Sequence, residues 1–125
     1  MRIEIDFQSE EALYEQVCNQ IIMSIATSAL HEGDVLPSVR AMADEIGINM
    51  HTVNKAYAIL RQEGYVNIDR RRGAVIALDL DKLRSLERLR ANMKMLLARS
   101  MVKGISRDEV HEIVDEIYDI YECDE

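Results

Sequence analysis

The chain has 125 residues and a formal net charge of −8, from 15 basic and 23 acidic side chains. This length supports one domain of ordinary size, or one domain with a short appendage. The sequence contains no run of 18 apolar residues, as a membrane-spanning helix would need, and its N-terminus lacks the apolar segment of a secretion signal. We therefore expect a cytoplasmic protein that does not bind membranes.

The acidic balance argues against nucleic-acid binding, because affinity for DNA depends on basic side chains that displace counterions. Residues 1–78 carry 7 basic and 11 acidic side chains, and residues 79–125 carry 8 and 12, so each part has a net charge of −4. The acidity is spread along the chain. A local basic patch can still dominate the field at one face of the molecule.

Two helices are expected in the first half of the chain. The first covers residues 10–29, where apolar residues recur at every fourth position: Leu13, Val17, Ile21 and Ile25. The second begins at Val39, because Pro37 disfavours helix at the residue before it and Ser38 can cap the free N–H groups. It should end near Glu45, with a buried side formed by Ala41, Met42 and Ile46.

A third helix should follow after a tight turn. Gly47 can adopt the positive φ that such a turn needs, and Asn49 is a favourable cap for the new helix. The spacing i, i+3, i+4, i+7 predicts a buried stripe of Val53, Ala56, Tyr57 and Leu60. The opposite side of this helix is then exposed.

Two short strands, at residues 65–68 and 74–77, are predicted after Gly64. They are joined by the basic turn Asp69–Gly73, which contains three consecutive arginines. Helix, turn, helix and hairpin in this order are typical of a winged helix-turn-helix. The predicted fold is therefore mainly α, with a small β-hairpin as the wing.

The tract from Leu36 to Gly73 resembles the GntR family of bacterial transcription regulators, whose DNA-binding domain has a pattern close to LPSxRxLAxxLGVSxxTVxxAYxxLxxEGxV. The matching residues are Leu36-Pro37-Ser38, Arg40, Ala43, Gly47-Ile48-Asn49, Thr52-Val53, Ala56-Tyr57, Leu60 and Glu63-Gly64. Residues 12–17 and 33–34 also resemble the family. The resemblance implies that residues 1–78 form a winged helix-turn-helix domain that binds a double-stranded DNA operator.

The expected DNA contacts lie at the start of the second helix, on the exposed side of the third and in the turn of the hairpin. They are Ser38, Arg40, Asn49, Met50, His51, Thr52, Asn54, Lys55, Arg70, Arg71, Arg72 and Gly73. The resemblance places a DNA-contacting arginine at Arg40, and the three consecutive arginines suit phosphate or the minor groove. Asn49 and Thr52 are interpreted as caps that can also reach phosphate, and Asn54 can read adenine.

Residues 79–125 predict two more helices, one over residues 81–101 and one that begins at the capping box Ser106–Glu109. Their apolar stripes are Leu86, Leu89, Met93, Leu96 and Leu97, then Val110, Ile113, Val114, Ile117, Ile120 and Tyr121. Two such helices cannot bury both stripes alone, so we expect a helical hairpin that packs against a second copy in a homodimer. This short tail resembles the YtrA subgroup, which implies a repressor whose gene commonly accompanies transporter genes.

No arrangement of residues indicates an enzyme, a cofactor or a metal site. The three histidines are widely separated, and no His/Cys or carboxylate cluster has metal-ligand spacing. Cys18 and Cys123 are expected to be free thiols, and the acidic side of the last helix a solvated face. The alternative is a winged-helix module that binds protein without binding DNA, which the net acidity and the apolar Met50 would suit. The operator, the regulated genes and any small-molecule effector stay unknown.

Overall fold

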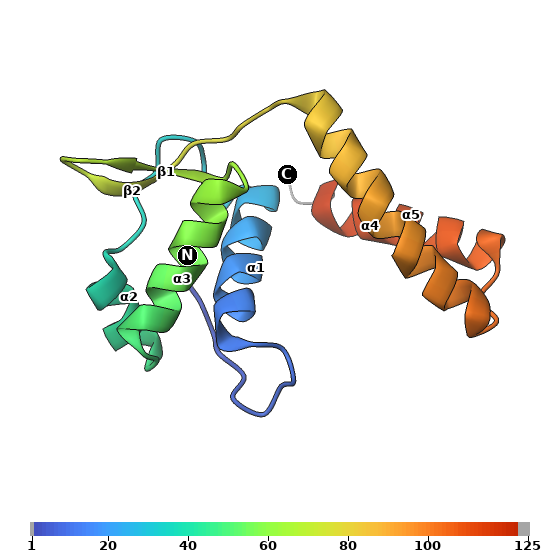
Figure 1. Ribbon diagram of the computed structural model, residues 1–125, viewed down its shortest axis with the longest axis horizontal. Helices are drawn as coiled ribbons and strands as arrows, with labels where there is room; N and C mark the ends of the chain where they lie inside the picture. Colours follow the sequence, from blue (N-terminus) through green and yellow to red (C-terminus); the bar gives the residue numbers. More distant parts are fainter. Residues whose placement is uncertain (1, 123–125) are drawn as a thin grey trace. The chain divides into compact units, whose positions relative to one another are not determined.

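The computed structural model describes residues 2–122 of the chain. Its elements are α1 (Leu13–Ala26), α2 (Val39–Ile46), α3 (Met50–Gln62), β1 (Val66–Asp69), β2 (Gly73–Ile76), α4 (Lys82–Val102) and α5 (Arg107–Glu122) (Figure 1). The chain divides between Asp79 and Leu80 into two compact units. The predicted fold, mainly helical with one β-hairpin, is confirmed. None of the described helices is long and apolar enough to cross a membrane.

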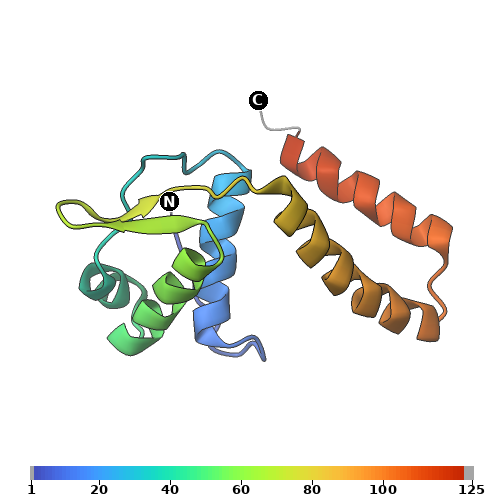
Figure 2. The ribbon, with the colours of Figure 1, turned by 45° about the horizontal axis from the view of Figure 1, so that its top comes forward.

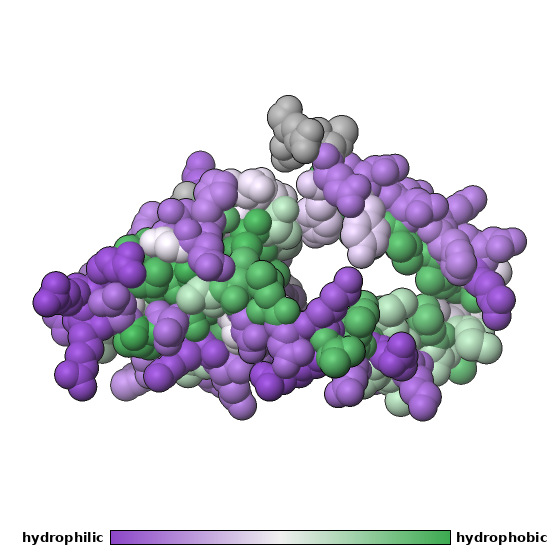
Figure 3. All heavy atoms as spheres, turned by 90° about the horizontal axis from the view of Figure 1, so that it is seen from above, coloured by the Kyte–Doolittle hydropathy of each residue, from purple (hydrophilic) through white to green (hydrophobic). Residues whose placement is uncertain are grey.

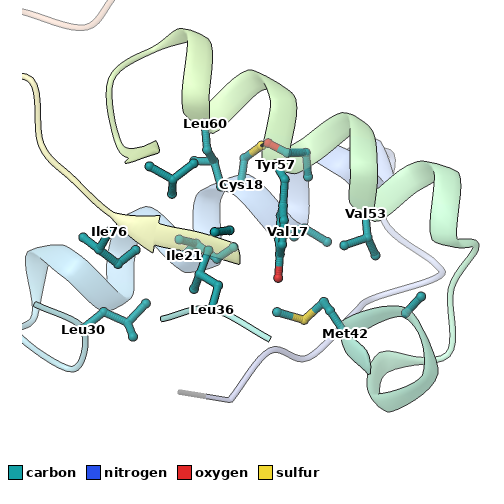
Figure 4. Close-up of a cluster of buried hydrophobic side chains, with 14 residues drawn as sticks. Val17, Cys18, Ile21, Leu30, Leu36, Met42, Val53, Tyr57, Leu60 and Ile76 are labelled. Carbon is teal, nitrogen blue, oxygen red and sulfur yellow. Dashed lines mark hydrogen bonds between the residues drawn. The ribbon is translucent and has the colours of Figure 1, made fainter. Parts of the chain in front are cut away.

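The core of the first unit lies between α1, α2, α3 and the hairpin (Figure 4). The predicted stripe on α3 is confirmed, since all four of its residues are buried. The prediction for α2 is wrong at Ala41, which is exposed, whereas Ala43 is buried beside Met42. The helix begins at Val39, so its core-facing stripe follows the i, i+3, i+4, i+7 spacing through Met42, Ala43 and Ile46.

Helix α1 is shorter at both ends than the predicted range of 10–29. Before it, the Gln16 side chain accepts a hydrogen bond from the Asp6 N–H (2.8 Å) and donates to the carbonyls of Asp6 and Glu11 (3.0 Å each). These bonds fix both ends of the turn at residues 7–11, which precedes the helix. After it, Ser28 adopts a positive φ of 65°, which ends the helix.

The hairpin is joined to α2 through the residues that precede that helix. β1 and β2 are antiparallel, with Asp69 opposite Gly73, so both strands lie one residue nearer the turn than predicted. The free edge of β2 pairs with residues 33–36. The N–H groups of Gly33 and Leu36 donate to the carbonyls of Ile76 and Ala74, at 2.8 Å each. β2 is therefore hydrogen-bonded along both edges.

Gly64 allows a sharp exit from α3, with a φ of +85°, and a Cβ added there would lie 2.7 Å from the Asp79 Cβ. Gly47 has a φ of +73° but open space at the same position. We expect Gly47→Ala to lower the free energy of unfolding by about 1–2 kcal/mol through its backbone conformation alone, and Gly64→Ala to lower it further. Urea denaturation followed by circular dichroism measures both. Equal losses would mean that Asp79 moves aside without cost.

Cys18 lies in α1 and is buried against α3. Its Sγ donates to the Ala56 carbonyl at 3.4 Å. Burial raises the pKa of the Cys18 thiol to about 11, so the thiol stays protonated and unreactive at neutral pH. Cys18 is a free thiol, as predicted, while Cys123 lies outside the described residues.

The second unit consists of α4 and α5, which run antiparallel (Figure 2). The predicted capping box is confirmed: the Ser106 N–H donates to Glu109 Oε1 (2.9 Å), and the Glu109 N–H donates to Ser106 Oγ (3.1 Å). The bond to Glu109 favours the charged carboxylate and lowers its pKa.

Neither α4 nor α5 contains a buried residue within the part of the chain that the structure describes. Of the eleven predicted stripe residues, seven are exposed, and the half-buried ones are Met93, Leu97, Val110 and Tyr121. The tail accordingly carries hydrophobic surface that is open to solvent (Figure 3).

Candidate nucleic-acid interface

The helix-turn-helix is fixed locally by a cap on each of its two helices. Ser38 Oγ accepts a hydrogen bond from the Ala41 N–H at 3.1 Å, at the start of α2. Asn49 Oδ1 accepts from the His51 N–H at 2.7 Å, at the start of α3. Both caps agree with the sequence interpretation. Thr52 is also interpreted as a cap from the sequence, but it lies half-buried in the first turn of α3, and Asn49 is the N-cap. Each cap leaves other N–H groups of its first turn available to an anion.

Hydrogen bonds around Leu36 and Pro37 hold α2, α3 and the wing in one arrangement. The Tyr57 hydroxyl, from α3, donates to the Pro37 carbonyl at 2.8 Å. The neighbouring Leu36 N–H is bonded to β2. Burial raises the pKa of Tyr57 above that of a free phenol, so the hydroxyl stays protonated and donates at any working pH (Figure 4). The start of α2 is therefore tied to both the recognition helix and the wing.

A groove of about 470 Å³ lies where these three elements meet. It is lined by Val39 of α2, Ile68 of β1 and five residues of α3: Asn54, Tyr57, Ala58, Arg61 and Gln62. The predicted site included Asn54 but missed Arg61. Arg61 follows Asn54 by seven residues and so lies on the same side of the helix. Continuing the exposed side to the end of α3 would have identified it.

The predicted contacts on α3 do not all point the same way. Met50, His51, Asn54 and Lys55 are exposed, as expected. The Lys55 ammonium, however, lies 4.0 Å from the centroid of the Tyr14 ring, which belongs to α1. This is a cation–π contact, and it holds Lys55 on the side of α3 that faces α1. Asn54 instead lines the groove between α3 and the wing.

Asp69 organises the turn at the tip of the wing. Its Oδ1 accepts hydrogen bonds from the N–H groups of Arg71 (2.8 Å) and Arg72 (3.2 Å), and its Oδ2 accepts from the Arg72 guanidinium (3.3 Å). The two backbone bonds are the main reason why the pKa of Asp69 is lowered. Gly73 closes the turn with a φ of +90°. The wing tip is the hydrophilic projection at the left of Figure 3.

The three arginines of the wing are therefore not equivalent. Arg72 is paired with Asp69, whereas Arg70 and Arg71 are exposed and form no ion pair within residues 2–122. With Arg40 at the start of α2 and Arg61 on α3, they place positive charge on each of the three joined elements. This arrangement suits phosphate and base edges. Within the same residues, no group of histidine, cysteine and carboxylate side chains could hold a metal ion.

Comparison with known proteins identifies the fold and its family. Residues 13–76, from the start of α1 to the end of β2, match the family "Bacterial regulatory proteins, gntR family". The HTH-type transcriptional repressor YtrA of Bacillus subtilis (strain 168) is 31% identical over 118 residues, which cover 92% of this chain and 91% of YtrA.

Two solved structures extend the similarity to the tail. The transcriptional antiterminator from Listeria monocytogenes EGD-e has 29% identity and a TM-score of 0.83, over 94% of this chain and 90% of that one. YtrA from Sulfolobus acidocaldarius, a GntR-family transcription factor, has 34% identity and a TM-score of 0.58, over 90% and 93%. These relatives regulate transcription and indicate no enzyme family. The chain therefore belongs to the GntR family of bacterial DNA-binding transcription regulators, and within it to the YtrA type.

Proposed function

We propose that this chain is a homodimeric repressor that acts in the cytoplasm on a palindromic operator. Residues 1–78 would bind the DNA and residues 79–125 would hold two copies together. The observation that carries the proposal is the joining of α2, α3 and the wing through the Tyr57–Pro37 and Leu36–Ala74 hydrogen bonds. A surface of three elements fixed in this way can meet DNA without rearrangement, which lowers the cost of binding.

In the proposed complex, α3 enters the major groove with its N-terminal half at the base edges. Asn54 is placed to read adenine through two hydrogen bonds, while Met50 and His51 lie nearer the start of the helix. Arg40 and the N–H groups at the start of α2 contact phosphate. Arg70 and Arg71 contact phosphate or the minor groove from the wing, and Arg61 contacts the backbone from the far end of the groove beside Asn54.

The homodimer is supported by the exposed stripes of α4 and α5, because a second copy offers the same apolar surface in return. Two copies would place two recognition helices about one turn of DNA apart, so the operator should have two related half-sites. Repression follows if the bound dimer excludes the transcription machinery from the promoter, and YtrA of Bacillus subtilis is a repressor. In this family the neighbouring genes commonly encode transporters, and their promoters are the first place to look for the operator.

The DNA-binding proposal is tested at the wing. We expect Arg71→Ala to weaken binding to operator and to random DNA alike, and to reduce the slope of log Kd against log salt by about 1, because a phosphate contact is lost. Lys103→Ala, in the tail, removes the same charge and should leave the slope unchanged. Gel-shift titration at several salt concentrations measures both, with an operator selected from genomic DNA. Wild-type protein that shows no salt-sensitive shift would favour the protein-binding alternative.

A further inference from the structure

The two tail helices carry opposite charge. α4 contains six basic residues and one acidic residue, a net charge of +5, whereas α5 contains seven acidic residues and one basic residue, a net charge of −6. The total charge of residues 79–125 hides this separation. Leaving Arg84 aside, no ion pair joins the charged residues of α4 to those of α5 within residues 2–122, although the two helices belong to one unit. The charges that border the apolar stripes of α4 and α5, such as Arg90, Arg99 and Glu116, can therefore meet a helix of another chain.

The charges border the apolar stripes, where they would meet a neighbouring helix. Arg90 and Lys94 line a groove along α4 together with the acidic Glu87 and the apolar Leu86, Met93 and Leu97. On the other border of the same stripe, Arg99 follows Leu96 by three residues and so lies beside it. Both borders of α4 thus carry basic residues, and on the side of the groove these outnumber the single acidic residue, Glu87.

The corresponding border of α5 is acidic. Glu116 lies three residues after Ile113 and four before Ile120, so it neighbours both stripe residues on the helix surface. Charged residues that border an apolar seam decide which helices pair in helical bundles, because opposite charges attract across the seam and like charges repel. A helix with two basic borders is best placed between two acidic helices.

Four helices from two copies can be ordered around a bundle in two ways. Either the two α4 helices are diagonal and each lies between two α5 helices, or like helices are adjacent. Adjacent like helices would bring two basic borders, or two acidic ones, to the same seam. We propose that the tail dimerises in the alternating order, with α5 of one copy against α4 of the other. The alternating order rests on the proposed homodimer. In this order, the opposite charges of α4 and α5 are the feature that selects a second copy of this chain as the partner.

The test uses a variant in which the sign of the charge is reversed at three positions of each helix, so that the net charge of the chain stays the same. It carries Arg88→Glu, Arg90→Glu, Arg99→Glu, Glu112→Lys, Glu116→Lys and Asp119→Lys. In the alternating order the variant should dimerise with itself. It should avoid the wild-type chain, because the reversed positions of α5 in one chain would then bring positive charge to the basic borders of α4 in the other. The reversed positions of α4 would likewise bring negative charge to the acidic border of α5. In the adjacent order the opposite holds, and the mixed dimer would be preferred.

The measurement is native mass spectrometry of full-length wild type and variant mixed in equal amounts, with a short tag on one chain. Tagged and untagged wild type mixed in the same way give the statistical control, in which half of the dimers are mixed. We expect far fewer mixed dimers than this control between wild type and variant, and a return toward it at high salt. A mixed fraction equal to the control, or above it, would overturn the proposed order.

The test separates this inference from the proposed function. If the wild-type chain alone is monomeric at micromolar concentration, the homodimer itself is wrong, whatever the charges do. If the six-site variant loses helicity by circular dichroism, the two-site version Arg90→Glu with Glu116→Lys replaces it. The same depletion of mixed dimers is then expected, to a smaller extent, and its absence would again contradict the alternating order.

Discussion

A chain that ends after Leu80 is expected to be a monomer and to bind the two-half-site operator about 10²–10⁴-fold more weakly than the full chain. The core of the first unit is built from residues between Ile3 and Leu78, so the truncated chain should keep its fold. What it loses is the link that makes binding to the second half-site intramolecular. Sedimentation velocity gives the assembly state, and fluorescence anisotropy with labelled operator gives the affinity.

A single half-site provides the control for this truncation. Because each half-site is contacted by one copy, the truncated and full chains should bind it with similar affinity. Circular dichroism and the melting temperature establish that the shortened chain is folded. A truncated chain that stays dimeric would place the interface in the first unit. A similar loss of affinity for single and paired half-sites would instead mean that the tail supports the DNA-binding unit itself.

The sequence predicts the elements of the fold where local physical chemistry decides them. The stripe on α3, the cap at Asn49 and the capping box at Ser106 depend on side chains within one or two helical turns, and the structure confirms all three. The ends of α1 depend on contacts between residues far apart in sequence. Gln16 bonds to Asp6, ten residues away, and no spacing rule reveals that pair.

For the candidate site, the sequence predicts which residues lie on the recognition elements, but not the direction of their side chains. Ser38 and Asn49 are the N-caps of α2 and α3, and the other predicted residues of these two helices lie within them. Gly73, predicted in the turn of the wing, is the first residue of β2. The sequence does not reveal that Arg72 is held by Asp69, or that Lys55 lies over Tyr14, because both depend on rotamers and on tertiary packing. Within residues 2–122, the arginines of the candidate interface that form no ion pair are accordingly Arg40, Arg61, Arg70 and Arg71. The three consecutive arginines of the wing are therefore indistinguishable in the sequence, although the structure pairs Arg72 with Asp69.

Replacement of Leu60 by alanine is expected to have the largest effect on stability. The Leu60 side chain is fully buried, at 0% exposure, among residues of α1, α3 and the hairpin. The substitution removes apolar contacts and leaves a cavity, so the free energy of unfolding should fall by about 2–5 kcal/mol. Leu80→Ala is the matched control, because the same atoms are removed from a side chain that is 80% exposed, and its cost should stay within about 0.5 kcal/mol. Urea denaturation of both variants gives the difference.

The Leu60 variant also separates stability from recognition. Leu60 faces the core, away from the groove that Asn54 and Arg61 line, so folded Leu60→Ala should bind the operator with wild-type affinity. Its binding should fail only on heating, together with the loss of helical circular dichroism, whereas Asn54→Ala should bind weakly at every temperature. If Leu60→Ala binds weakly while fully folded, the core beneath α3 also sets the position of the recognition surface. The Tyr57–Pro37 bond, one turn away, would then be the contact through which it acts.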